Sequence, residues 1–104
     1  MIVTMGESVP GRDTVEILGT VRGNTVRTRF FGRDIMAALR NLVGGEVPEY
    51  TKLMAEAREQ AIDRMIADAK NSGADAVICL RVTTSMIMGG SAELLAYGTA
   101  VRLS

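Results

Sequence analysis

The segment that most constrains the fold has apolar residues at three- and four-residue spacing. It extends from Pro48 to about Ser72, and its apolar positions are Tyr50, Leu53, Met54, Ala57, Ala61, Met65 and Ala69. This spacing places side chains on one face of an α-helix. Pro48 suits the first helical position because proline lacks an N–H that would have no partner there. Gly73 is a suitable stop. The sequence therefore predicts a long amphipathic helix, which needs an apolar surface to cover.

The chain before this helix alternates apolar and polar residues, which is typical of half-buried strands. We predict a short strand from Ile2 to Met5 and a longer one starting at Thr14. Gly23-Asn24 marks either a turn into a second short strand, Thr25 to Arg29, or a bulge within one long strand. In the longer strand, one face is expected to carry Val15, Ile17, Gly19 and Val21. The opposite face is expected to carry Glu16, Leu18, Thr20 and Arg22.

A short helix is predicted from Asp34 to Val43, with Asp34 as its N-cap and Gly44-Gly45 as its end. Its apolar residues recur at helical spacing: Ile35, Met36, Leu39, Leu42 and Val43.

Two strands are predicted after the long helix, Ala76 to Met88 and Ala92 to Leu103, joined by a turn at Gly89-Gly90-Ser91. In the first, one face carries Ile78, Leu80, Val82, Met86 and Met88, and the other carries Cys79, Arg81, Thr83 and Ser85. The pattern predicts an α+β fold, in which an antiparallel or mixed sheet packs against one short and one long helix. We expect one domain spanning residues 1–104.

Composition limits the class of protein. The 104 residues are 47% hydrophobic but only 4% aromatic, so the core is expected to consist of aliphatic residues, alanine and methionine. A domain of this size buries a limited fraction of its surface, and association with copies of itself would bury more. The 12 basic and 12 acidic residues cancel, which argues against a strongly charged partner.

The expected location is the cytoplasm. A single cysteine excludes an internal disulfide framework and suits a reducing compartment. The first residues lack the basic and apolar regions of a signal peptide. No apolar run approaches the ~20 residues that span a bilayer, so we expect no membrane partner.

Sulfur atoms at Cys79, Met86 and Met88 raise the question of a soft-metal site. A regular strand would point Cys79 away from the two methionines, because side chains alternate between faces. Soft metals prefer several thiolates or imidazoles, and the chain has one cysteine and no histidine. The methionines are interpreted as packing residues. Cys79 could ligate a metal only with its copies at an oligomer axis.

A second candidate is a ligand site at the junction of the two helices. Gly44-Gly45 would allow close backbone approach, and the long helix offers free N–H groups at its start. Arg40, Glu46 and Tyr50 could supply side-chain contacts. The alternative is a simple helix–helix connection.

Arg81 is a further candidate, because rows of Arg81, Thr83 and Ser85 from several subunits could line a channel. The alternative, which we favour, pairs Arg81 with Glu93 on the neighbouring strand.

Four arginines, Arg22, Arg27, Arg29 and Arg33, fall within twelve residues and surround Phe30-Phe31. Such a patch could bind single-stranded nucleic acid by phosphate contact and base stacking. The zero net charge instead favours an edge strand kept soluble by arginine.

Four motifs together resemble the YbjQ-like family: ESVPGR, RNLVGGEVPEYTKL, GADAVICLR and AYGTAVRL. These are small uncharacterised proteins, labelled as heavy-metal-binding. The resemblance covers essentially the whole chain and implies an α+β subunit similar to that of the dodecins. It also implies a homo-oligomeric ring, a pentamer. Relatives carry Gly or Val at the position of Cys79, so no metal ligand is transferred from the family.

The residues contain no catalytic motif and identify no cofactor. Our first hypothesis is a cytoplasmic homo-oligomer that binds a metal ion or small ligand between subunits. The second is an enzyme that uses carboxylates and arginine near the helix junction. The third is a nucleic-acid-binding module that uses Arg22 to Arg33.

Overall fold

The chain forms an α+β fold, as predicted. The computed structural model describes residues 1–28, 48–87 and 91–104, without the side chains of 28, 48–51 and 87. In these ranges a sheet has the strand order β1-β3-β4-β2. β1 runs parallel to β3, and β4 is antiparallel to both β2 and β3, so the sheet is mixed. The elements are β1 (Ile2–Val3), β2 (Thr14–Thr28), α2 (Pro48–Asn71), β3 (Ala76–Ile87) and β4 (Ser91–Leu103).

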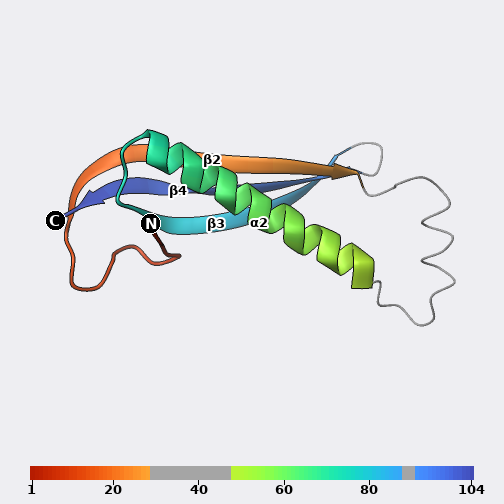
Figure 1. Cartoon of the computed structure of the whole chain (residues 1–104), viewed down its shortest axis with the longest axis horizontal. Helices are drawn as coiled ribbons and strands as arrows, with labels where there is room; N and C mark the ends of the chain where they lie inside the picture. Colours follow the sequence, from red (N-terminus) through yellow and green to blue (C-terminus); the bar gives the residue numbers. More distant parts are fainter. Residues whose placement is uncertain (29–47, 88–90) are drawn as a thin grey trace, which may run out of the picture.

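Helix α2 crosses one face of the sheet diagonally (Figure 1) and matches the predicted long helix closely. Its end is fixed by Gly73, whose φ of 80° is one that glycine adopts readily. The N–H of Gly73 donates to the carbonyl of Lys70 (3.0 Å), and that of Ala74 donates to Ala69 (3.1 Å). This pair of bonds is the Schellman motif, which satisfies two carbonyls of the last turn. The predicted stop at Gly73 is confirmed.

The core lies between α2 and the sheet and is made mainly of small aliphatic residues. The fully buried residues of α2 are Ala57, Ala61, Met65 and Ala69, and those of the sheet side include Val21, Val77, Ala96 and Ala100. Gly23 is needed for this approach, since a Cβ there would collide with the backbone of Ala61 and Met65. The helix therefore sits directly on β2.

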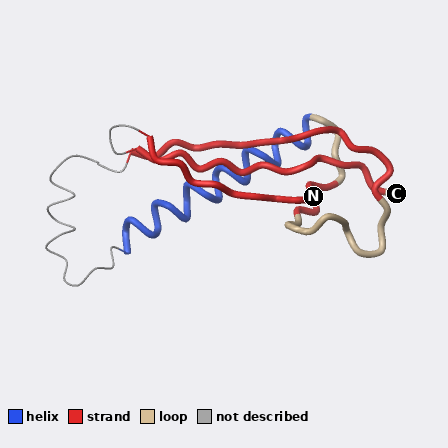
Figure 2. The backbone as a smooth tube through the Cα atoms, turned by 180° about the vertical axis from the view of Figure 1, so that it is seen from behind, coloured by secondary structure: helices blue, strands red, loops and turns tan. Residues whose placement is uncertain are grey.

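A second apolar cluster lies on the other face of the sheet, near the chain termini. It contains Val9, Ala76, Ile78, Val101 and Leu103. Seen from behind, the strands lie in front of α2, and the N-terminal loop occupies the end of the sheet where the termini lie (Figure 2). The sheet is thus covered at one end on this face and by the helix on the other.

Strand β2 is one continuous strand through Gly23 and Asn24, which agrees with the long-strand alternative. Its irregularities lie elsewhere: the register with β4 shifts between Thr14 and Glu16 and between Ile17 and Gly19. Because each extra residue reverses the alternation, the predicted faces are wrong in this part. Ile17 is 69% exposed, whereas Leu18 packs against the core beside α2.

Strand β3 also contains a bulge that the sequence did not predict. Its register with β4 shifts between Ile78 and Arg81, and Cys79 has a φ of 57°. Ile78 belongs to the cluster away from the helix, while Leu80 packs against the core under α2. The prediction that Ile78 shares a face with Leu80 and Val82 is therefore wrong.

Several predicted features lie partly or wholly outside the described residues. The predicted helix Asp34 to Val43 and Met88 fall there, and so does the turn at Gly89-Gly90. Strand β1 is shorter than predicted, ending at Val3. Within the described ranges, no helix combines the length and apolarity required to cross a membrane.

Candidate functional site

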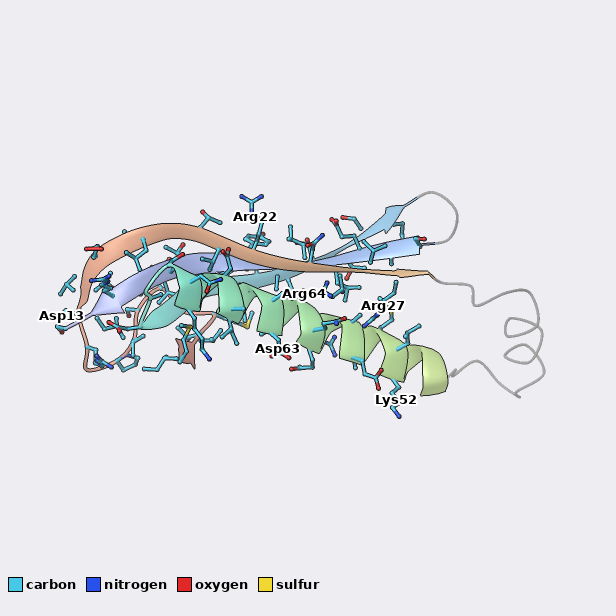
Figure 3. All side chains as sticks on the ribbon, turned by 45° about the horizontal axis from the view of Figure 1, so that its top comes forward. Asp13, Arg22, Arg27, Lys52, Asp63 and Arg64 are labelled. Carbon is cyan, nitrogen blue, oxygen red and sulfur yellow. The ribbon has the colours of Figure 1, made fainter. Side chains whose placement is uncertain are left out.

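A hollow of about 470 Å³ lies beside α2 near the end of β2. Its lining residues are Arg27, Lys52, Ala55, Glu56, Glu59, Gln60 and Asp63. Figure 3 shows Arg27, Lys52 and Asp63 along this side of the helix. Arg27 reaches it because odd-numbered residues of this part of β2 face α2: Nη2 of Arg27 donates to Oε1 of Gln60 at 2.6 Å.

The charges around this hollow are mixed. Glu56, Glu59 and Asp63 recur along one side of α2 and are exposed, and Arg27 and Lys52 carry the opposite charge. The Nε atom of Arg27 is buried and lacks a hydrogen-bond partner among the described atoms. A buried guanidinium nitrogen without a partner is costly, so this atom suits a water molecule or a small polar solute in the hollow. The sequence analysis missed the site because Gln60 gave no signal within the helix.

The donor atoms of the described residues do not make a metal site within one chain. No group of three histidine, cysteine or acidic side chains lies close enough together in these ranges to hold a metal ion. The half-buried Cys79 packs against the apolar cluster that includes Ile78. Met86 of β3 and Arg27 of β2 both pair with Ala92 of β4. Because directly paired residues share a face, Met86 lies on the helix side with Arg27. Cys79 lies on the opposite face. The expected separation of the two sulfur atoms is confirmed.

Arg81 does not pair with Glu93, and that prediction is wrong. Arg81 lies opposite Tyr97, whereas Glu93 lies opposite Ser85. The guanidinium of Arg81 instead turns back to the main chain: Nη1 donates to the carbonyls of Met5 (3.0 Å) and Leu80 (2.7 Å). The physical reason is the register of β3 and β4, in which Glu93 lies four residues along β4 from Tyr97, the partner of Arg81.

The other candidate residues of the helix junction are not brought together in the described part of the chain. Arg40 and Glu46 lie outside it, and Tyr50 is placed in α2 only by its backbone. The ligand site at the helix junction therefore stays a prediction.

The two described arginines of the predicted patch, Arg22 and Arg27, lie on opposite faces of the sheet. Arg22 lies opposite Tyr97 on the face away from α2, whereas Arg27 points to Gln60 of α2. Arg29, Arg33 and the two phenylalanines lie outside the described residues. Because Arg22 and Arg27 face opposite sides of the sheet, they cannot follow one nucleic-acid strand together on a flat surface.

Comparison with known proteins places this fold in a family. The sequence profile of the YbjQ-like family, described as "Putative heavy-metal-binding", matches residues 1–104. The protein is thus a small α+β protein whose whole chain matches one family. The chain belongs to the YbjQ-like family, whose curated members carry the name UPF0145, and the resemblance seen in the four motifs is confirmed.

Relatives occur in archaea and bacteria. The UPF0145 protein of Archaeoglobus fulgidus is 58% identical over 103 residues, covering 99% of this chain and 95% of its own. That of Halorubrum lacusprofundi is 62% identical over 97 residues, or 93% of each chain. The corresponding protein of Vibrio campbellii is 54% identical over 103 residues, 99% of each.

A solved structure shares the fold. It is a protein of unknown function of the DUF74 family from Pediococcus pentosaceus, with a TM-score of 0.69 and 14% identity. The similarity covers 100% of this chain and 98% of that one. At this identity the likeness supports the fold alone.

Proposed function

We propose that the protein is a non-enzymatic cytoplasmic homo-oligomer, a pentameric ring, that binds a metal ion or small ligand between its subunits. The oligomer is supported mainly by one observation: every residue from Arg81 to Met86 of β3 is exposed in the single chain. A strand that leaves both faces in water gains little from burial. Neighbouring copies would provide the missing cover.

Element lengths support the same proposal. β2, β3 and β4 contain 15, 12 and 13 residues, about twice the common strand length of ~5–6 residues. The single described helix packs mainly on β2 and β4, so it covers a limited part of one face. On the other face Ile17 and Val26 remain more than half exposed. A neighbouring copy that covered this face would remove these apolar side chains from water.

The metal or ligand part of the proposal is supported by the family description. Within one chain the donors are sparse, and rotational symmetry multiplies them. One Cys79 or one carboxylate per chain becomes several around an axis. The number of five subunits is supported by the family resemblance.

Native mass spectrometry of tag-free protein tests this function, with the same sample measured after denaturation. The expected result is a mass of several chains plus an excess that scales with the subunit number and disappears on unfolding. The Cys79→Ser variant is the matched control for a thiolate site. A ring without excess mass after exposure to zinc, copper and nickel would contradict metal binding, and a monomer would contradict the whole proposal.

A further inference from the structure

The two strands that flank β4, namely β2 and β3, differ in how their outer edges are protected. At the edge of β2, the main-chain N–H of Arg22 donates to Oδ2 of Asp68 at 3.1 Å. Two residues further on, Nη1 of Arg64 donates to the carbonyl of Asn24 at 2.6 Å. Arg22 and Arg64 are labelled in Figure 3, where α2 runs beside β2. Side chains of the helix therefore occupy two of the main-chain groups that another strand would need at this edge.

Among the residues that the structure describes, the partners at the edge of β3 lie along its first half. The N-terminal segment bonds to it through the N–H of Cys79, which donates to Gly6 (2.9 Å), and the N–H of Leu80, which donates to Thr4 (3.0 Å). Arg81 then closes this part by donating to the carbonyl of Leu80. Residues 81–86 are exposed beyond this point.

The bond from Leu80 shows which later residues of β3 direct their N–H and C=O groups to the outer edge. In an antiparallel ladder, alternate residues direct both N–H and C=O to the same side. Leu80 directs its N–H to the outer edge, so Val82, Thr84 and Met86 do the same. We call these three residues the β3 edge. None of them is charged, and no proline interrupts them, so the usual devices that prevent strand addition are missing from this stretch.

We propose that the β3 edge binds the β3 edge of a second copy of the chain, antiparallel and centred on Thr84. The sequence is complementary to itself in this register. Val82 (37% exposed) lies opposite Met86 (59% exposed) of the other copy, and each Thr84 lies opposite its counterpart. Thr83 lies opposite Ser85 on the other face. Apolar pairs and Thr–Ser pairs are both favourable across strands.

This contact rests on the proposed homo-oligomer and specifies one of its interfaces. A two-fold contact uses the same surface on both copies and joins them in pairs. It therefore gives an even number of chains, and two pentameric rings joined through it contain ten. The contact also places Val82 and Met86 of both copies in one apolar row.

A disulfide at Thr84 tests the register. Thr84→Cys, in a Cys79→Ser background, places two thiols on residues whose Cα atoms are about 5.5 Å apart in a hydrogen-bonded pair. That separation is within the ~4.4–6.8 Å that a disulfide spans. Mild oxidation should convert most of the chain to a covalent dimer. Ser85→Cys in the same background is the matched control, since its own copies lie diagonally at about 7–8 Å and should yield little dimer.

Thr84→Pro provides a second measurement. Its N–H points away from β4, so proline there removes a bond to the second copy and leaves the ladder to β4 intact. Native mass spectrometry should show half the subunit number, with an unchanged circular dichroism spectrum. If Thr84→Cys gives no more dimer than Ser85→Cys while the protein remains oligomeric, this inference is overturned and the proposed function stands. A monomeric mass for the unmodified chain would overturn both.

Discussion

The β2 and β3 strands flank the same central strand, yet their surroundings differ. β2 is covered by α2, and the helix also bonds to its edge through Asp68 and Arg64. In the described part of the chain, β3 is covered over its first residues, whereas Arg81 to Met86 are exposed. The difference arises because α2 crosses the sheet diagonally and packs mainly on β2 and β4 (Figure 1). It teaches that the helix packing which stabilises the subunit lies on the β2 side, whereas the association that we propose would use the β3 side.

Two methionines give the largest expected contrast. Met65→Ala removes a fully buried side chain from the core under α2 and should lower the free energy of unfolding by about 3 kcal/mol, through lost burial and a cavity. Met86→Ala, on exposed β3, should change the stability of the subunit by less than about 0.5 kcal/mol. Urea denaturation at a protein concentration where the chain is dissociated measures both. Equal losses in the free energy of unfolding would mean that β3 is as well packed within the subunit as the core under α2.

Gly23 tests the close contact between α2 and β2. Gly23→Ala should cost about 2 to 3 kcal/mol, because the new Cβ collides with backbone atoms of Ala61 and Met65, which cannot rotate away. Gly6→Ala is the control, since its nearest neighbour would be Thr4 Oγ1 at 3.5 Å. Thermal unfolding would show the difference as a lower midpoint. An unchanged midpoint for Gly23→Ala would contradict direct packing of the helix on β2.

Thr25 and Thr84 occupy equivalent levels of β2 and β3. Thr25 is 2% exposed and its hydroxyl donates to the carbonyl of Ala57 at 3.0 Å. Thr25→Val keeps the shape but removes this bond, and we expect a loss of about 1 kcal/mol. Thr84→Val should be neutral within about 0.5 kcal/mol, because its side chain is exposed. A stability loss in Thr84→Val measured on the dissociated chain would show that β3 is covered within one subunit.

The smallest effect is expected at Glu16. Its Oε1 lies 3.9 Å from Nε of Arg102, and both side chains are about half exposed. Because water and salt screen such pairs, Glu16→Gln should change the free energy of unfolding by less than about 0.5 kcal/mol. The same experiment at high salt should give no difference at all. A change above 1 kcal/mol would show that the start of β2 depends on this pair.

The predictions from periodicity succeeded where the chain is regular. The helix from Pro48, its stop at Gly73 and the two strands after it were correct because each is determined by local spacing and by glycine at the helix end. They failed at bulges: Ile17 was assigned to the wrong partners, and so was Ile78. A bulge inserts one residue and reverses every side chain after it. Gly19, with a φ of 116°, lies at a shift in β2 and is the kind of residue that marks a bulge, whereas Cys79 is not.

The candidate site was less predictable than the fold. Arg81 was singled out, but its bonds to Met5 and Leu80 depend on the N-terminal segment, which is distant in sequence. The hollow beside Arg27 was missed because it requires knowledge of which residues of α2 lie opposite β2. Predicting such contacts needs the crossing angle of helix and sheet, which periodicity does not contain.

The sequence by itself determined the class of elements and the family. Local spacing determines which face of a helix is apolar, and the four motifs are local strings of residues. The tertiary structure alone decided that α2 lies on β2 and leaves the second half of β3 exposed. That outcome depends on Gly23, which permits the helix to approach, on the bulges that set the faces, and on Asp68 and Arg64, which bond to the edge of β2. These are contacts between residues far apart in the chain, and they exist only once the chain has folded.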